Sequence, residues 1–402
     1  MFKEIINDLI IEKESGIYGL GLSAEDYSIN KVRYLRISDI DDNGCIINDD
    51  KKSISADNID EYILKENDLV VARTGNSTGR TYMHEKSDGI MAYAGFLIKY
   101  VFDSRKINPR YMKYFCMSDY YKNQIKNFSG STRGNMNAND FKTIEVIFPD
   151  RNQQNKMVYL LDLIDKKIRI NKAINDNLLK YAEHIYNYYF MQYNFPDDEG
   201  KPYMENRGSL KWSKELRRNI PYNWNVLPLN EACDVQYGFP LSTEKFSNKG
   251  LPVIRIRDIS DNSYSAMTEE NVSNDYITQK GDLLIGMDGN FQMNYWHSAG
   301  YIVNQRITRL RKTIIPLMAL RPQIEPYINA KVSNVARSTV GHLSDKDIKS
   351  LFILIPDTKT DLSMFDTCLD KICQNINENT HLTRLRNWLL PLLMNGQATI
   401  AD

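Results

Sequence analysis

The feature of this sequence that most constrains its fold is an internal repeat, because three segments of the first half recur in the same order in the second half. The matched segments are 34–40 with 253–259, 67–76 with 281–290, and 129–150 with 336–357. The last pair aligns without a gap and shares Ser-Thr-x-Gly and a terminal Pro-Asp. The offset between the copies shortens from one match to the next. One domain, duplicated and then trimmed in its loops, explains this order better than two unrelated domains do.

Each copy contains short runs rich in Val, Ile and Leu that are bounded by Gly, Asn or Asp, a pattern that predicts strands. These runs are 32–37, 68–73, 95–102, 252–257, 282–286 and 350–355. Asn108-Pro109 predicts the start of a helix that runs to about Lys126, because proline suits the first helical turn. Each copy is therefore predicted to be mostly β with short helices.

Each copy ends at Pro-Asp and passes into a long stretch whose apolar residues alternate at intervals of four and three, the pattern of a coiled-coil seam. The first seam comprises Met157, Leu161, Ile164, Ile168, Asn171, Asn175, Leu178, Ala182, Ile185 and Tyr189. The second comprises Phe365, Leu369, Ile372, Ile376, Asn379, Leu382, Leu385, Leu389 and Leu392. A long helix buries such a stripe only against a partner. Because two-fold duplication reverses one helix relative to the other, we predict that the two pack antiparallel.

The predicted fold class is α+β, with two repeated domains, mostly β with short helices, separated by two long antiparallel coiled-coil helices with pseudo-two-fold symmetry. The predicted parts are a first repeated domain at 1–150, a central long helix at 151–190, a linker leading into the second repeat at 191–229, a second repeated domain at 230–357 and a C-terminal long helix at 358–402. Trp224, just before the second copy, has no counterpart near the N-terminus, so the opening strand of the first copy is not located. Two similar modules held apart suit a two-part target better than a single catalytic centre.

Composition limits the function further. The 51 basic residues are balanced by 51 acidic ones, although 105–142 carries a local excess of Lys and Arg. The cysteines lack any Cys-x-x-Cys pair, which argues against the usual zinc sites and against a disulfide framework. No stretch approaches the about 18 apolar residues of a membrane helix, and the first residues lack a signal-peptide core. We therefore expect a reduced, cytoplasmic protein that does not enter a membrane.

Motifs for catalysis are incomplete throughout the chain. Residues 75–81 (GNSTGRT) are one residue short of a P-loop and carry Arg in place of Lys, and the counterpart loop 286–290 has no basic residue. Asn108-Pro109-Arg110-Tyr111 lacks the second proline of an adenine-methyltransferase motif, and no Gly-rich cofactor fingerprint is present. Neither Pro-Asp is followed by the Glu-x-Lys of a nuclease, and the histidines form no metal or nucleophile pattern. The sequence thus predicts no catalytic residue, metal or cofactor in this chain.

Polar, Gly-rich loops at equivalent places in both copies are the remaining candidate site. Arginine pairs with guanine edges, asparagine and glutamine pair with adenine, and all of them bind phosphate. The candidate DNA-binding residues of the first copy are Arg36, Arg73, Thr74, Asn76, Ser77, Arg80, Ser131, Thr132, Arg133 and Asn135. Those of the second copy are Arg257, Asp288, Asn290, Gln292, Arg337, Ser338, Thr339 and His342. The copies differ where readers of two different sequences should, as at Arg73-Thr74 against Met287-Asp288. For any single loop residue, plain solvent exposure is an equally good explanation.

Taken together, these segments resemble the specificity subunits of Type I restriction-modification systems over nearly the whole chain. The resemblance is carried by the paired Arg-Ile-x-Asp-Ile segments, Asn-Asp-Leu and Gly-Asp-Leu-Leu with their Gly-rich loops, Ser-Thr-x-Gly, and Pro-Asp before a long helix. The ending 385–396 (LRNWLLPLLMNG) also resembles that family. The resemblance implies two target-recognition domains, which read a bipartite double-stranded DNA target, and two conserved helices.

The resemblance also implies partners that carry the chemistry. Two methyltransferase subunits would supply S-adenosylmethionine and adenine methylation, and restriction (motor) subunits would use ATP and Mg²⁺, so this chain itself would be non-catalytic. Three alternatives remain: the specificity subunit of a related Type II system with a fused methyltransferase-nuclease, an orphan subunit that mimics the complex, and a coiled-coil adaptor that binds proteins instead of DNA. Neither the half-site sequences nor their spacing follow from the residues.

Overall fold

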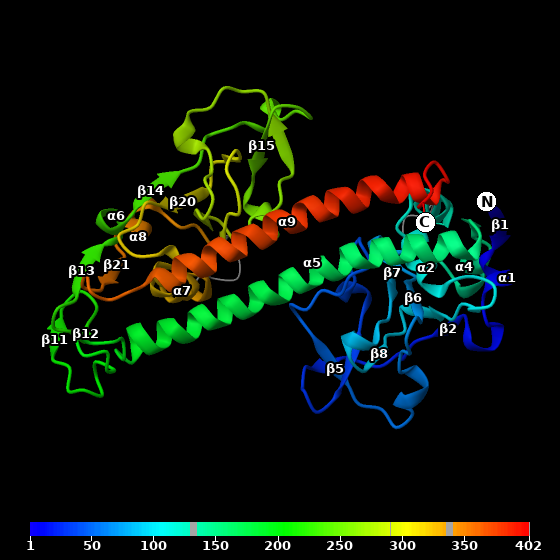
Figure 1. Ribbon diagram of the computed structural model, residues 1–402, viewed down its shortest axis with the longest axis horizontal. Helices are drawn as coiled ribbons and strands as arrows, with labels where there is room; N and C mark the ends of the chain where they lie inside the picture. Colours follow the sequence, from blue (N-terminus) through cyan, green and yellow to red (C-terminus); the bar gives the residue numbers. More distant parts are fainter. Residues whose placement is uncertain (129–134, 290, 335–340, 402) are drawn as a thin grey trace. The chain divides into compact units, whose positions relative to one another are not determined.

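The computed structural model describes residues 1–128, 135–289, 291–334 and 341–401. The chain divides into two compact units (Figure 1). Unit 1 comprises Met1–Lys166 and Thr383–Asp402, and unit 2 comprises Lys167–Leu382. Each unit therefore holds one repeated domain and parts of both long helices, and each is described by itself.

Unit 1 contains two four-stranded sheets. The first has the order β2 (Ile17–Tyr18), β9 (Leu97–Tyr100), β6 (Leu69–Ala72) and β7 (Thr81–Met83), with antiparallel neighbours throughout. The second has the order β3 (Glu25–Asp26), β5 (Lys52–Ile54), β4 (Val32–Leu35) and β8 (Met91–Tyr93), in which β4 and β8 run parallel. Strands β6 and β9 are buried along their whole length, so their runs of branched apolar residues mark the domain core as the sequence predicts.

The helices of unit 1 share a hydrophobic core with the first sheet. They are α1 (Ile6–Leu9), α2 (Pro109–Phe115), α3 (Asp119–Phe128) and α4 (Ala138–Lys142). Helix α2 starts where Asn108-Pro109 predicts, and the Asn108 side chain accepts a hydrogen bond from the Arg110 amide at 2.9 Å. The prediction of a single helix to Lys126 is wrong in one respect, because the helix is interrupted after Phe115 and a second one begins at Asp119. The Ser118 hydroxyl accepts from the Tyr121 amide at 3.3 Å and so starts a new helix.

The opening strand of the first repeat is β1 (Phe2–Ile5), which pairs antiparallel with β10 (Glu145–Phe148). In unit 2 the same place is taken by β13 (Asn225–Pro228), which pairs with β21 (Phe352–Ile355). The residue after each opening strand makes the same bond: the Ile6 amide donates to the Ile144 carbonyl at 2.9 Å, and the Leu229 amide donates to the Leu351 carbonyl at 2.8 Å. This register places Met1 where the second repeat has Trp224.

Unit 2 repeats the layout of unit 1. Its four-stranded sheet has the order β14 (Asp234–Tyr237), β20 (Ile307–Arg311), β17 (Leu283–Gly286) and β18 (Met293–Tyr295). A second sheet contains β16 (Ala266–Thr268), β15 (Leu251–Ile254) and β19 (Ile302–Val303), with β15 and β19 parallel. The helices are α6 (Leu229–Ala232), α7 (Leu317–Asn334) and α8 (Asp345–Lys349). The matching strand order and matching parallel pair confirm the duplication.

The segment 191–229, predicted as a linker, is an ordered part of unit 2. It contains β11 (Leu210–Ser213), paired with β12 (Arg218–Pro221), and ends in β13. Trp224 is fully buried and stacks on Phe195 with ring centroids 4.6 Å apart. Phe190, at the end of the preceding helical segment, packs against the same indole at 5.2 Å. The segment therefore fastens the second repeat to the end of the first long helix.

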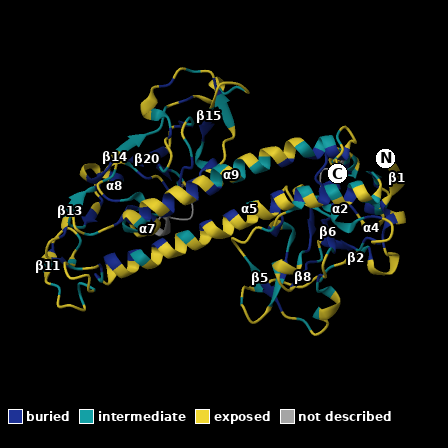
Figure 2. Ribbon diagram, viewed as in Figure 1, coloured by how far each residue is buried: buried dark blue, intermediate teal, exposed yellow. Residues whose placement is uncertain are grey.

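The two long helices are α5 (Arg151–Tyr186), which continues as a π-helical turn over Asn187–Met191, and α9 (Ser363–Met394). Within unit 2 they pack antiparallel: Asn171 donates to Asn379 at 2.9 Å, and Asn375 donates to Asn175 at 2.7 Å. Residue numbers rise along one helix as they fall along the other. The antiparallel prediction and the two polar positions of the first seam are confirmed, and the helices alternate buried and exposed residues along their length (Figure 2).

The C-terminal part of the second seam differs from its prediction. Leu385 is 43% exposed, whereas the neighbouring Arg386 is only 4% exposed. The Arg386 guanidinium lies 3.1 Å from the buried carboxylate of Asp165 on α5, within unit 1. A buried carboxylate requires a charged partner. The seam therefore shifts by one residue so that Arg386, instead of Leu385, faces α5.

The two Pro-Asp pairs have different roles. Asp150 caps α5, because its side chain accepts from the Gln153 amide at 3.0 Å. Asp357 accepts from the Thr360 amide at 3.1 Å and belongs to a turn that precedes α9, which starts only at Ser363.

Candidate nucleic-acid interface

The polar loops that the sequence singles out lie side by side within each unit. In unit 1 the residue after β6 meets the segment before α4, and Thr74 and Asn135 form an isolated antiparallel bridge. In unit 2 Asp288 and His342 form the same bridge. The flanking bonds also match, because Met136 donates to the Arg73 carbonyl and Leu343 donates to the Met287 carbonyl, both at 2.8 Å. The structure therefore joins the Gly-rich loop of each repeat to the described residues just before the following short helix, Asn135 and Met136 in unit 1 and His342 and Leu343 in unit 2.

A third segment joins each pair of loops. The Arg73 amide donates to the carbonyl of Phe96, just before β9, at 3.0 Å. The Met287 amide donates to the carbonyl of Arg306, just before β20, at 2.8 Å. Each repeat thus has four equivalent positions held together by backbone bonds, which we call the platform. The platform residues are Arg73, Thr74, Phe96 and Asn135 in unit 1, and Met287, Asp288, Arg306 and His342 in unit 2.

The platform of unit 1 combines one arginine with an aromatic surface. The Arg73 guanidinium lies over the ring of Tyr18, 5.1 Å from its centroid. The Arg73 Nε is buried and has no hydrogen-bond partner among the described residues. The Tyr18 hydroxyl accepts from the Ala138 amide at the start of α4, at 3.1 Å. Phe96 is exposed beside this arginine, so the surface offers both a cation and a stacking face.

Tyr18 and its counterpart Tyr237 are site residues that sequence reasoning missed. The Tyr237 hydroxyl donates to Asp345 at the start of α8, the place where Tyr18 meets α4. Each tyrosine is followed by a glycine with no room for a side chain: a Cβ on Gly19 would lie 2.3 Å from the Tyr93 carbonyl oxygen, and one on Gly238 2.0 Å from that of Asn304. The repeated Tyr-Gly pair is the signal that could have found them.

The loop 75–81 is a hairpin connection between β6 and β7, with a short 3₁₀ turn over Gly75–Ser77. It is not followed by a helix, so it lacks the architecture of a P-loop. Asn76 is exposed and Ser77 is half-buried. Arg80 pairs with Asp42 through Nε at 2.6 Å and lies 3.4 Å from the Ser77 hydroxyl.

Gln292 occupies the position of Arg80 in the second repeat. The Ala72 amide donates to the Arg80 carbonyl, and the Gly286 amide donates to the Gln292 carbonyl, both at 2.8 Å. The Gln292 Oε1 is buried without a hydrogen-bond partner among the described residues.

Arg36 and Arg257, two further predicted contacts, are not at the platform. The Arg36 guanidinium lies 2.7 Å from Asp39 and also donates to the Asp50 carbonyl at 2.6 Å, and its hydrogen bond to Asp39 raises its pKa. Arg36 therefore holds a turn. Its structural counterpart is Arg255, whose amide donates to Asp258 at 2.9 Å as the Arg36 amide does to Asp39 at 2.8 Å. Arg257 is exposed, with its Nε 3.8 Å from Asp258.

Seven of the predicted site residues lie outside the described residues. They are Ser131, Thr132, Arg133, Asn290, Arg337, Ser338 and Thr339.

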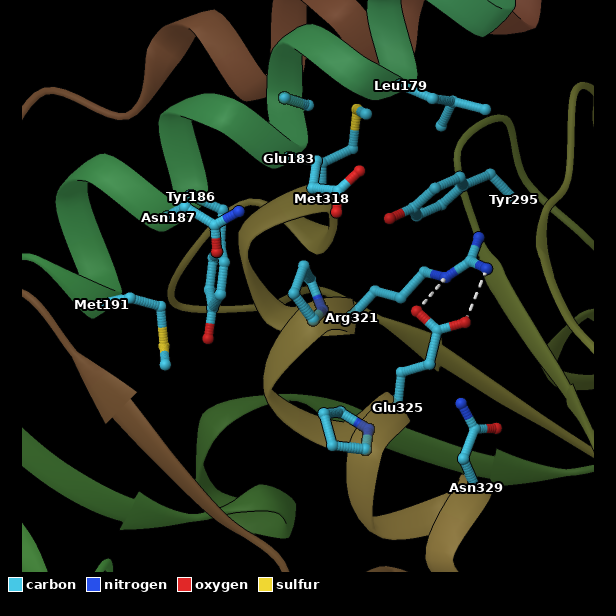
Figure 3. Close-up of a pocket in the computed structure, with 13 residues that line it drawn as sticks. Leu179, Glu183, Tyr186, Asn187, Met191, Tyr295, Met318, Arg321, Glu325 and Asn329 are labelled. Atoms are coloured by element: carbon cyan, nitrogen blue, oxygen red, sulfur yellow. Dashed lines mark hydrogen bonds and ion pairs between the residues drawn. The ribbon is translucent and has the colours of Figure 1, made fainter. Parts of the chain in front are cut away.

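A separate groove in unit 2, of about 650 Å³, lies between the end of α5 and α7 (Figure 3). The Arg321 guanidinium pairs with Glu325 at 2.9 Å and lies over the Tyr295 ring, 5.4 Å from its centroid. Met191, Met318 and two prolines of α7 contribute apolar lining. The groove therefore surrounds a paired arginine with largely apolar side chains.

The family model of the Type I restriction modification DNA specificity domain matches this chain twice, over residues 22–180 and 221–384. The chain belongs to this family. The two matches coincide with the two repeats, each with its following helix, and the predicted α+β class with repeated domains and long antiparallel helices is confirmed.

Relatives and a solved structure agree with this family. The specificity subunit of the Type I restriction enzyme EcoBI of Escherichia coli is 25% identical over 161 residues, which cover 38% of this chain and 34% of that protein. The specificity subunit of the Type I restriction enzyme MjaIX of Methanocaldococcus jannaschii is 21% identical over 322 residues, which cover 73% of this chain and 69% of that protein. The crystal structure of a Type I restriction-modification S subunit from M. genitalium covers 98% of this chain and 95% of that one, with a TM-score of 0.58 and 15% identity, and shows a shared fold.

Two further observations apply to the part of the chain that the structure describes. No helix there is long and apolar enough to span a membrane. Within the same residues, no three or more His, Cys, Asp or Glu side chains gather as metal ligands would. That this chain carries no metal or cofactor stays a prediction.

Proposed function

We propose that this chain is the non-catalytic DNA-specificity subunit of a Type I restriction-modification complex. Each repeated domain reads one half of a bipartite double-stranded target with its platform and the adjoining loops. One observation carries the proposal: identical backbone bonds present different side chains in the two repeats, with Thr74 and Asn135 in one and Asp288 and His342 in the other. A constant scaffold with divergent polar side chains is what two readers of different sequences require.

The partners that we propose are two methyltransferase subunits and restriction subunits, which would bring S-adenosylmethionine, ATP and Mg²⁺. An exposed apolar stripe on α5 supports docking of partner helices. Within unit 2 it contains Ile170, Ile174 and Tyr181, all exposed and spaced by four and seven residues, which places them on one side of the helix. A coiled-coil adaptor would need this stripe too, but it would not need two platforms of different composition.

We also propose a cytoplasmic location, where the protein meets DNA under reducing conditions. Burial raises the pKa of the Cys373 thiol to about 11, so this thiol stays protonated and unreactive at neutral pH.

The experiment that tests the function is expression of the chain with its methyltransferase subunits, followed by sequencing of methylated adenines in host DNA. With the chain present, we expect one bipartite methylated motif; without it, we expect none. Exchange of residues 1–150 for those of another specificity subunit should replace one half of the motif. An exchange that alters both halves or neither would contradict separate reading by the two domains.

The same preparations test the absence of catalysis. The isolated chain should transfer no methyl group from labelled S-adenosylmethionine to duplex DNA. Transfer by the chain alone would refute a purely positioning role.

A further inference from the structure

Arg306 stands at a platform position that the sequence motifs do not mark. Its carbonyl is bound by the Met287 amide at 2.8 Å, and the preceding Gln305 amide donates to the Phe239 carbonyl at 2.8 Å. Between these anchors Arg306 has a φ of 71°, in the left-handed region that side chains other than glycine rarely adopt. Such conformations persist where the surroundings impose them, and they gather at functional positions.

The Arg306 side chain is 58% exposed and is directed by an acidic neighbour. Its Nε lies 3.7 Å from one carboxylate oxygen of Asp288, and the other oxygen lies 2.7 Å from Nδ1 of His342. Among the described residues, Asp288 is the only carboxylate within ion-pair distance of Arg306. Because the carboxylate contacts the Nε side of the guanidinium, the terminal nitrogens remain available for another acceptor.

The first repeat also has one arginine on its platform, but at a different position. Arg73 corresponds to Met287, and Phe96 corresponds to Arg306. The platform arginine therefore follows one of two neighbouring strands in the first repeat and precedes the other in the second repeat. Adjacent strands lie about 4.8 Å apart, and successive base pairs rise by about 3.4 Å. The exchange therefore moves a contact by one to two base steps relative to the scaffold.

We propose that Arg306 is a base-reading residue of the second domain, directed by Asp288 toward a guanine in its half-site. Bidentate pairing with guanine O6 and N7 is the most common specific contact of an arginine in the major groove. Asp288 acts as a positioning residue through Arg306, and Arg73 supplies the equivalent contact in the first domain. This inference rests on the proposed function and adds a residue and a base class to it.

The test uses the full chain assembled with its methyltransferase subunits and two DNA libraries, one randomised in the half-site of the second domain and one randomised in the half-site of the first. Arg306→Ala should lose the preference for guanine at one position and weaken binding of the cognate duplex by about 5- to 150-fold. Arg306→Lys should also lose this preference, because an ammonium cannot form the forked pair. Asp288→Asn should relax the same position to a smaller degree. The other half-site should stay unchanged in all three variants, which reports that the protein is folded and assembled.

Arg217→Ala is the matched control, because Arg217 is another exposed arginine of unit 2 with a left-handed backbone, φ 51°. It should leave base preference and affinity as in the parent protein. If Arg306→Ala weakens all sequences alike and Arg306→Lys restores binding, the residue contacts phosphate and the inference is overturned. It is likewise overturned if Arg306→Ala keeps the parent preference. A change at a different base in Asp288→Asn would show that Asp288 itself reads DNA and would refute its positioning role.

The two levels of the argument fail in different ways. If the parent complex methylates no bipartite motif, the proposed function falls, and the inference falls with it. If the parent complex does so and the Arg306 variants retain its base preference, only the inference falls.

Discussion

Replacement of Arg386 by alanine should be among the most damaging single changes in unit 1. Arg386 and Asp165 are both almost fully buried, with their charged groups 3.1 Å apart. Asp165 also has Lys113 at 2.9 Å and accepts a hydrogen bond from the Tyr114 hydroxyl at 3.1 Å. Removal of one member of a buried ion pair costs about 3–5 kcal/mol. Because Lys113 remains, we expect the lower end, about 3 kcal/mol.

The assay is thermal unfolding followed by circular dichroism. In a domain of this size class each kcal/mol lowers Tm by about 2–4 °C, so a loss of about 3 kcal/mol predicts a fall of about 6–12 °C. Arg384→Ala is the control, since Arg384 is exposed on the same helix and its removal should cost little. The double variant Asp165→Leu with Arg386→Met should recover most of the loss, because it removes both buried charges and Lys113 keeps Glu85 at 3.5 Å as a partner.

The pH dependence gives a second check on Asp165. Burial raises the pKa of this carboxyl, but Lys113 and Arg386 outweigh burial and hold its pKa below the ordinary value of 3.8. A depressed pKa contributes stability above pH 3.8 that is lost as the pH falls through the folded-state value. The penalty of Arg386→Ala should therefore shrink in strong acid, where Asp165 is protonated. A penalty equal to that of Arg384→Ala at neutral pH, or one that grows in acid, would refute this account.

Two further predictions concern packing. Gly19→Ala should lower Tm and weaken DNA binding by the first domain, because the added Cβ would overlap the Tyr93 carbonyl oxygen. Gly21→Ala is the control and should change neither quantity, because the space around its Cβ is open. Equal effects of the two substitutions on Tm and binding would contradict this prediction. Replacement of both Asn175 and Asn375 by leucine should raise Tm, because the buried pair costs stability while it sets the register of the helices. A fall in Tm would show that this amide pair is worth more than the leucine packing that replaces it.

Much of the candidate site could be predicted from the sequence, because its loops are marked by a repeat. The hairpin after β6 and the segment before α4 were both expected to be polar loops, and the structure brings Thr74 beside Asn135 and Asp288 beside His342. Arg36 looked equally suitable as a DNA contact, since arginine in a repeated motif is a good candidate. Its pairing with Asp39, three residues away, and with the Asp50 carbonyl holds a turn, and only the folded chain shows that these partners occupy its guanidinium.

The sequence by itself determined the duplicated domain, the core strands, the long antiparallel helices and the Asn positions of the first seam, because periodicity and repetition can be read along the chain; Asn375, the partner of Asn175, was not predicted. Only the tertiary structure decided which residues stand together. Strand β1 is as long as β6 and β9, but its residues are exposed and include Lys3 and Glu4, so it is recognised only through its pairing with β10. Arg386 replaces Leu385 in the seam because Asp165 lies opposite. Phe96 and Arg306 join the platform through strand pairing that no nearby residue encodes. Pairing and charge neutralisation act between residues far apart in the chain, so only the folded protein shows them.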